Sequence, residues 1–130
     1  MPRRRSFSGP FREALPRWLT VISTSDPVGQ NHDLSPELFL MSSDAATIVQ
    51  LTNDPAFGAG VVRAATISGS GNRVLFLADT DPLATNPGRY DQLFVVDTDG
   101  SNLTQLTSAI SDDEEVWGFS ISDDGARIVY

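Results

Sequence analysis

Two loops of this sequence carry the same polar residues at the same spacing. Asp26-Pro27-x-x-x-Asn31 returns further along the chain as Asp81-Pro82-x-x-x-Asn86. Aspartate can form an Asx turn, proline fixes φ, and asparagine can bond a loop to its own backbone, so the motif predicts a structured loop. The same oxygen and amide groups can contact a ligand or a cation, and this alternative stays open.

A run of four acids adds negative charge at a third place in the chain. Such a run is typical of a solvated loop, but it can also attract a basic partner or hold Ca²⁺ weakly through oxygen ligands. Together with the loop motif it gives the weak candidate binding residues. They are Asp26, Asn31, Asp81, Asn86, Asp112, Asp113, Glu114 and Glu115.

The sequence shows no catalytic constellation. It contains no cysteine, and neither a nucleophile elbow nor a metal-ligand spacing surrounds His32, the single histidine. Residues 97–102 resemble the opening of a calcium loop, but Ser108 stands at the twelfth position, where that loop needs an acid. We therefore predict a hairpin turn there and a protein that is not an enzyme, with no catalytic or metal residues and no cofactor, Ca²⁺ being the alternative.

Charge is divided unevenly along the chain of net charge −8. Residues 1–17 hold five arginines and one glutamate (+4), and the rest holds four arginines and 16 acids (−12). An acidic body repels phosphates, which argues against nucleic acid and favours a basic protein or a small cationic ligand. No apolar run is long enough for a transmembrane segment, and the basic leader, residues 1–17, lacks the apolar region of a signal peptide and is expected to be disordered.

The candidate loops lie within a sequence repeat of about 55 residues. Residues 25–52 and 80–107 align without a gap at an offset of 55, with nine identities in 28 positions. Ordinary composition predicts roughly two identities. A second block, residues 67–76, returns as residues 121–130 at an offset of 54. A fixed period of this length is typical of an array of structural units.

Each unit reads as four short strands separated by turns. The complete unit, 64–107, has predicted strands at 64–68, 73–78, 92–97 and 102–107. Residues 18–52 supply the last three strands of a preceding unit, and residues 116–130 the first two of a following one, which places Trp117 and Phe119 in a packed strand. Residues 74–77 are all apolar, so both faces of the sheet must be covered. This favours an all-β, partial β-propeller of antiparallel blades over a two-layer sandwich.

Two segments resemble the TolB-like, WD-related β-propeller repeat family. Its pattern is a Ser-Pro-Asp-Gly turn, a basic residue, an apolar strand, an aromatic strand, an Asp-Gly hairpin and a terminal Leu-Thr. Residues 121–130 and 92–107 follow it, with Asp123 in place of the usual proline. The resemblance covers about residues 18–130. It implies an interaction platform of the cell envelope or an accessory domain of a peptidase, and hence a periplasmic or extracellular location.

We therefore expect a non-catalytic interaction or ligand-binding module. Its long loops, 24–36 and 79–91, would share one face with the connections 53–63 and 108–115. Two alternatives stay open: a propeller fragment attached to a hydrolase or peptidase, and a calcium-stabilised adhesion repeat. A closed propeller needs roughly 220 to 440 residues at this repeat length, so we expect a fragment of a longer array or a homo-oligomer that completes the ring.

Overall fold

The computed structural model describes residues 17–54 and 60–130, so the predicted leader lies outside the described residues except for Arg17. Within these ranges the fold is all-β, without a helix, and its sheets are antiparallel. The first sheet has the order β1 (Trp18–Ser23), β2 (Glu37–Ser42), β3 (Ile48–Gln50). The middle sheet has the order β4 (Val62–Ile67), β5 (Arg73–Ala78), β6 (Gln92–Asp97), β7 (Thr104–Gln105). The last sheet pairs β8 (Ser120–Ile121) with β9 (Ile128–Val129).

The strands of the middle sheet follow the sequence prediction closely. β5 and β6 begin and end at the predicted residues, and β4 begins two residues earlier than predicted, at Val62. β7 is shorter than the predicted 102–107. Asn102 has a left-handed backbone with φ of 56°, which does not continue a strand.

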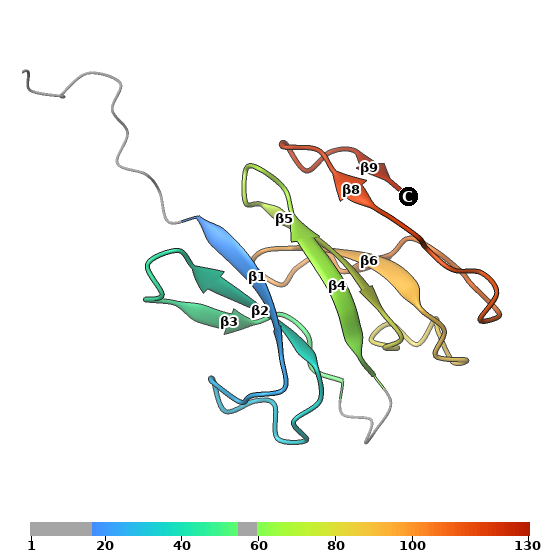
Figure 1. Ribbon diagram of the computed structural model, residues 1–130, viewed down its shortest axis with the longest axis horizontal. Helices are drawn as coiled ribbons and strands as arrows, with labels where there is room; N and C mark the ends of the chain where they lie inside the picture. The colour runs from blue at the N-terminus through green and yellow to red at the C-terminus, as the bar shows by residue number, and fades with distance from the viewer. Residues whose placement is uncertain (1–16, 55–59) are drawn as a thin grey trace, which may run out of the picture.

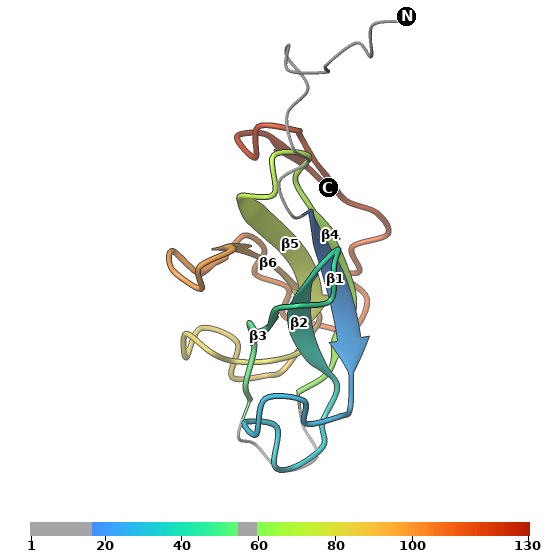
Figure 2. The same ribbon diagram turned by 90° about the vertical axis from the view of Figure 1, so that its left-hand side faces the viewer.

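The three sheets lie side by side, with β4 in contact with both β1 and β8 (Figure 1). The tight turns at residues 68–72 and 122–126 are at one end of the molecule. Loops 24–36 and 79–91 are at the other end, as Figures 1 and 2 both show. The predicted placement of the two long loops on a common face is therefore seen in the structure. No helix of the described residues is long and apolar enough to cross a membrane.

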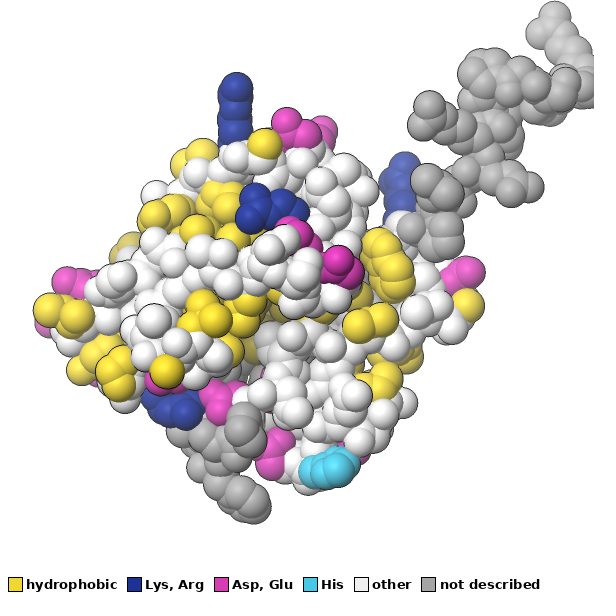
Figure 3. Space-filling view, turned by 180° about the vertical axis from the view of Figure 1, so that it is seen from behind, with side chains coloured by type: hydrophobic (Ala, Val, Ile, Leu, Met, Phe, Trp, Pro, Cys, Tyr) yellow, Lys and Arg dark blue, Asp and Glu magenta, His cyan; other side chains and the backbone are white. Residues whose placement is uncertain are grey.

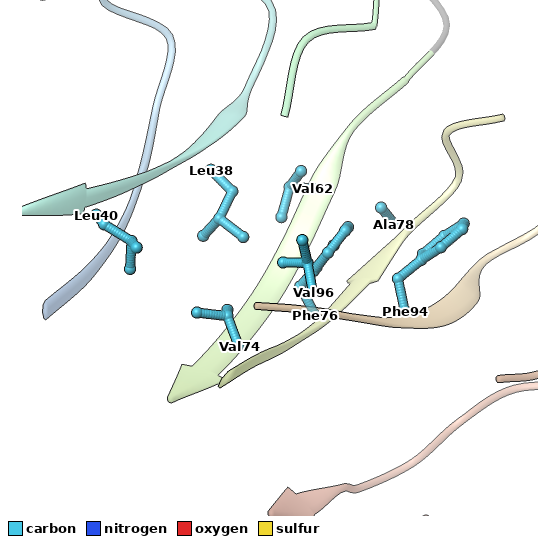
Figure 4. Packing of buried hydrophobic residues seen from close by; sticks show 8 residues of the cluster. All are labelled: Leu38, Leu40, Val62, Val74, Phe76, Ala78, Phe94 and Val96. Carbon is cyan, nitrogen blue, oxygen red and sulfur yellow. The ribbon is translucent and has the colours of Figure 1, made fainter. Parts of the chain in front are cut away.

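One face of the middle sheet packs against the first sheet. Phe76 and Phe94 are paired across β5 and β6, and their rings stack with centroids 5.3 Å apart and planes inclined by 16°. Leu38 and Leu40 of β2 belong to the same buried cluster (Figure 4). Its other buried members are Val62, Val74, Ala78 and Val96. Stacking of rings in this range adds roughly 0.5–1.5 kcal/mol to the effect of burial alone.

The opposite face of the middle sheet packs against the last sheet. Leu75, Leu93 and Val95 form this second buried cluster, against which Phe119 and Ile121 lie. Neighbouring residues of a strand point to opposite faces, so the unbroken apolar runs of β5 and β6 are explained by these two clusters. The prediction that both faces are covered is confirmed.

Trp117 departs from the packing prediction. Phe119 lies against the second cluster, but Trp117 is 91% exposed. β8 begins only at Ser120, so both residues precede the strand. The predicted strand position is therefore wrong for both, whereas the predicted packing is wrong for Trp117 and right for Phe119.

Candidate functional site

The first long loop is held together by its own polar residues. Asn31 is buried; its backbone N–H donates to Asp26 Oδ1 (2.8 Å). Its side-chain Nδ2 donates to the carbonyl oxygens of Ser25 (3.0 Å) and Ser35 (2.9 Å). The Asx geometry expected from the Asp-Pro-x-x-x-Asn motif is therefore present, and the Asn31 amide group is used within the loop.

The second long loop makes the same bonds one repeat later. The Asn86 N–H donates to Asp81 Oδ1 (2.7 Å). Asn86 Nδ2 donates to the carbonyl oxygens of Thr80 (3.0 Å) and Tyr90 (2.7 Å). Asn86 is 2% exposed, so its side chain anchors the loop from inside. The motif thus positions the carboxylates of both loops on rigid backbone.

Backbone conformation is also repeated between the loops. Gly29 and Ala84 have φ of 75° and 55°, and Leu34 and Arg89 have φ of 55° and 52°. Each pair is separated by 55 residues in the sequence. Residues other than glycine rarely adopt positive φ. The loop geometry is therefore imposed by the Asp and Asn hydrogen bonds and not by local backbone preference.

Beneath each long loop lies a buried polar residue that sequence reasoning missed. Glu37 accepts hydrogen bonds from the Asp54 N–H (2.9 Å) and from the Thr52 hydroxyl. Gln92, 55 positions later, accepts through Oε1 from the Thr107 hydroxyl (2.7 Å) and from the N–H of Ala109 (3.0 Å). The signal in the sequence was the matching of Glu37 with Gln92 and of the two threonines at one offset. These bonds fix the chain that follows the last strand of each sheet.

The four-acid run lies on the exposed surface. Asp112, Asp113, Glu114 and Glu115 are all exposed, and Glu114 Oε2 accepts from the N–H of Ile110 (2.8 Å). His32 is exposed as well, with Nε2 2.8 Å from the Gly29 carbonyl oxygen. In the described part of the chain no group of three or more His, Cys, Asp or Glu is placed to hold a metal ion.

A pocket of about 430 Å³ opens between the first and middle sheets at the long-loop end. Leu51, Phe76 and Leu103 supply its apolar part. Its polar part and rim are formed by Thr52, Asn53, Asp54, Thr80, Asp81 and Pro82. The space-filling view from behind shows hydrophobic side chains within a hollow and acidic side chains along its lower margin (Figure 3). The volume lies in the range of about 300–1,000 Å³ that is usual for ligand sites.

The pocket brings together residues from distant parts of the sequence. Asp81 comes from the second long loop, and Asp54 follows the last strand of the first sheet. Arg89 Nη1 donates to Asp54 Oδ2 (2.8 Å), which joins the two sheets and raises the pKa of the Arg89 guanidinium. Of the candidate residues, Asp81 lines the pocket, whereas Asp26, Asn31 and Asn86 do not.

The lining contains two carboxylates, and one of them already has a basic partner. Asp54 pairs with Arg89 (2.8 Å), which lies beside the described lining, and Asp81 Oδ1 accepts from the Asn86 N–H. A cation with an apolar body suits the pocket through Asp81, because its charge can face that carboxylate while its carbon atoms leave water. An anion of the same shape also buries its apolar surface in the pocket, but its charge is repelled by the carboxylate.

Comparison with known proteins gives no match to a family model, to a curated protein or to a solved structure.

Proposed function

We propose that this chain is a non-catalytic binding module of stacked, propeller-type β-sheets that recognises a basic partner at its long-loop end. The observation that carries the proposal is the pocket between the first and middle sheets. It has an apolar floor, and two carboxylates line it: Asp81, and Asp54, which pairs with Arg89. A lysine side chain of a partner combines the two properties that the pocket favours, since it has an apolar stem and a cationic end.

The propeller-type arrangement is proposed on three grounds. The sequence repeats at an offset of 55, and the loops have matching φ values and matching Asx bonds at that offset. In addition, the middle sheet buries apolar side chains on both faces. In an array of blades each sheet is covered by its two neighbours, which is the situation of this middle sheet.

The magnitude of the interaction decides what kind of partner the pocket suits. Burial of about 100 Å² of alkyl surface contributes roughly 2.5 kcal/mol at about 25 cal/mol per Å². A partly exposed ion pair adds roughly 0.2–1 kcal/mol. The sum of roughly 3 kcal/mol corresponds to a dissociation constant of about 3–10 mM. One side chain in one pocket is therefore a weak contact, suited to a partner that makes further contacts.

The test uses two small probes of the same length and opposite charge. We expect hexylammonium to bind the full chain with a dissociation constant of about 10 mM and hexanoate to bind several-fold more weakly, because the probes differ in the sign of their charge. The preference should decrease as salt is added, because the ion pair is partly exposed. Equal binding of the two probes, or binding of neither, would contradict the proposal.

Two variants test whether hexylammonium binds in the pocket. Asn53 is an exposed lining residue, so Asn53→Lys should leave the fold intact, put an ammonium at the rim and abolish hexylammonium binding. Val28→Lys is the matched control, since Val28 lies in an exposed position of a long loop and outside the lining. It adds the same charge at the same end and should retain binding.

A further inference from the structure

Arg89 places a basic charge at the edge of the pocket. Its Nη1 donates to Asp54 Oδ2 at 2.8 Å, and Asp54 is one of the residues that line the pocket. The Asp54 side chain is only 10% exposed, whereas that of Arg89 is 31% exposed. A carboxylate that is largely removed from water needs a partner for its charge, because desolvation disfavours an isolated ion. Arg89 supplies such a partner from within the chain.

The charge of Arg89 also acts on the second carboxylate of the lining. The pKa of the Arg89 guanidinium is raised first by its hydrogen bond to Asp54, and further by the negative charges of Asp54, Asp81 and Asp79. Electrostatic interaction is mutual, so Arg89 makes the potential at Asp54 and Asp81 less negative. A cationic ligand in the pocket therefore meets a field that Arg89 has already weakened.

The loop that carries Arg89 adopts the same conformation without an arginine. Leu34 stands at the corresponding position of the first long loop, 55 residues earlier, and is 58% exposed. Arg89 and Leu34 have φ of 52° and 55°. The Arg89 N–H donates to the Asn86 carbonyl oxygen (3.0 Å), and the Leu34 N–H donates to that of Asn31 (3.2 Å). The backbone conformation of the loop therefore does not depend on the guanidinium.

The ion pair is an addition to the repeat and not part of it. Leu34 stands for Arg89 in the first long loop, and Ala109 stands for Asp54 after the last strand of the middle sheet. The pair joins residues 35 positions apart, one from the second long loop and one from the chain after β3. A charge that the loop fold does not require, placed beside a lining carboxylate, can act on what the pocket binds.

We propose that Arg89 determines the charge selectivity of the pocket by holding Asp54 as its internal counter-ion. Asp81 is then the carboxylate that meets the ligand, and the pocket takes a single ammonium group, such as that of one lysine side chain. This inference rests on the proposed function, the binding of a cation in this pocket. The new element is the role of Arg89, which lies outside the described lining and acts on the ligand through the charge of Asp54.

Arg89→Met removes the charge and keeps an unbranched, apolar side chain. Asp54 then acts on the ligand without its guanidinium partner, so that two carboxylates attract a cation. A partly exposed ion pair is weak, and we therefore expect hexylammonium to bind the full-length variant about two- to fivefold more tightly than the wild type. Hexanoate should bind the variant more weakly than the wild type. Both affinities are measured by titration of amide chemical shifts.

Arg63→Met is the matched control for the loss of one positive charge. Arg63 pairs with Asp79 (3.0 Å) and Asp91 (2.7 Å), and neither acid is among the lining residues that the structure describes. This variant loses the same charge and a comparable ion pair, and hexylammonium should bind it as it binds the wild type. The double variant Arg89→Met/Asp54→Asn removes the freed carboxylate together with the arginine, so the gain of Arg89→Met should be lost.

Asp54→Asn tests the pair from its other side and does not depend on the folding of Arg89→Met. The asparagine keeps an oxygen that can accept the Arg89 hydrogen bond, whereas the negative charge is gone. The positive charge of Arg89 then acts on the pocket without that of Asp54 to offset it. We expect hexylammonium to bind about two- to fivefold more weakly than to the wild type.

The outcomes separate this inference from the proposed function. Hexylammonium binding that is no tighter in Arg89→Met, an equal gain in Arg63→Met, or a gain that persists in the double variant overturns the role of Arg89. Unchanged or tighter binding to Asp54→Asn overturns it as well, while a cation-binding pocket remains. Failure of hexylammonium to bind the wild type and Arg89→Met overturns the proposed function together with this inference.

Discussion

Ala45 and Gly100 occupy the same place in the hairpins of the first and middle sheets, and both have a left-handed backbone, with φ of 58° and 85°. The Ala45 N–H donates to the Ser42 carbonyl oxygen and the Gly100 N–H to that of Asp97, both at 2.8 Å. The hairpin thus imposes the same conformation on alanine as on glycine. Alanine in this region costs about 1–2 kcal/mol.

Ala45→Gly is therefore expected to stabilise the protein. Relief of the left-handed backbone contributes about 1–2 kcal/mol, and the greater freedom of glycine in the unfolded chain offsets about 0.4–1 kcal/mol of it. The free energy of unfolding measured in urea should rise by about 0.5–1 kcal/mol. Gly100→Ala, which meets no atom within 4 Å of its added Cβ, should lower it by a similar amount. A loss of stability in Ala45→Gly would show that the turn does not need this conformation.

Glu37→Gln is expected to be tolerated. Gln92 makes the corresponding bonds at the same place in the middle sheet, and a glutamine at position 37 keeps an oxygen for the Asp54 N–H and the Thr52 hydroxyl. Glu37→Ala removes the acceptor of both bonds at half-buried positions, which should cost about 1–3 kcal/mol in all. Unfolding in urea distinguishes the two variants. Equal destabilisation by both would mean that the charge of Glu37 is what the site requires.

Phe94→Ala should be severely destabilising. Phe94 is 0% exposed and stacks on Phe76, so its removal loses both burial and ring contact. The expected loss is about 3–5 kcal/mol. Leu19→Ala is the control, because Leu19 is 48% exposed on the first sheet, and it should cost less than about 1 kcal/mol. A Phe94 variant with near-normal stability would contradict the packing of the first and middle sheets.

Stability should fall in acid partly through Asp99. The Ser101 hydroxyl (2.5 Å) and the N–H of Ser101 (2.9 Å) donate to its carboxylate and lower its pKa. A carboxyl whose pKa is lower in the folded state contributes stability above its unfolded value, about 3.9, and loses it as pH falls through the folded value. Asp99→Asn should therefore show a smaller decrease in the urea midpoint than the wild type between about pH 5 and pH 2.

Asp113→Asn is the control for that pH series. Asp113 is exposed in the four-acid run, and its replacement removes an equal charge from another loop. The decrease in the urea midpoint with falling pH should differ less from that of the wild type in Asp113→Asn than in Asp99→Asn. An identical effect of both variants would mean that net charge, and not the bonds from Ser101, determines the pH dependence.

The middle sheet could be predicted because its signals are local. Residues 74–78 and 93–96 are apolar runs bounded by polar and turn residues, which indicated both the strand limits and the need to cover two faces. The Asp-Pro-x-x-x-Asn loops were predicted for the same reason, since each bond joins residues five apart. Hydrogen bonds between residues close in the sequence require particular residue types at a fixed spacing, and a single sequence displays that spacing.

The pocket could not be predicted because it depends on packing. Leu51 and Phe76 are 25 positions apart and come from different sheets, and they meet only when the sheets stack. Sequence reasoning identified Asp81 but not Asp54 or Asn53, whose place in the pocket follows from the bonds to Glu37 and Arg89 beside them. It also predicted wrongly that Trp117 is packed, because aromatic character does not reveal whether a strand extends far enough to cover a residue.

Amide chemical-shift mapping with hexylammonium tests the binding account most directly. The amides of Asn53, Asp54, Thr80 and Asp81 should shift as the probe is added, while those of the hairpin residues Ala45 and Gly100 stay in place. Shifts confined to the hairpins, or no shifts at a probe concentration well above about 10 mM, would contradict the assignment of a cation-binding pocket at the long-loop end.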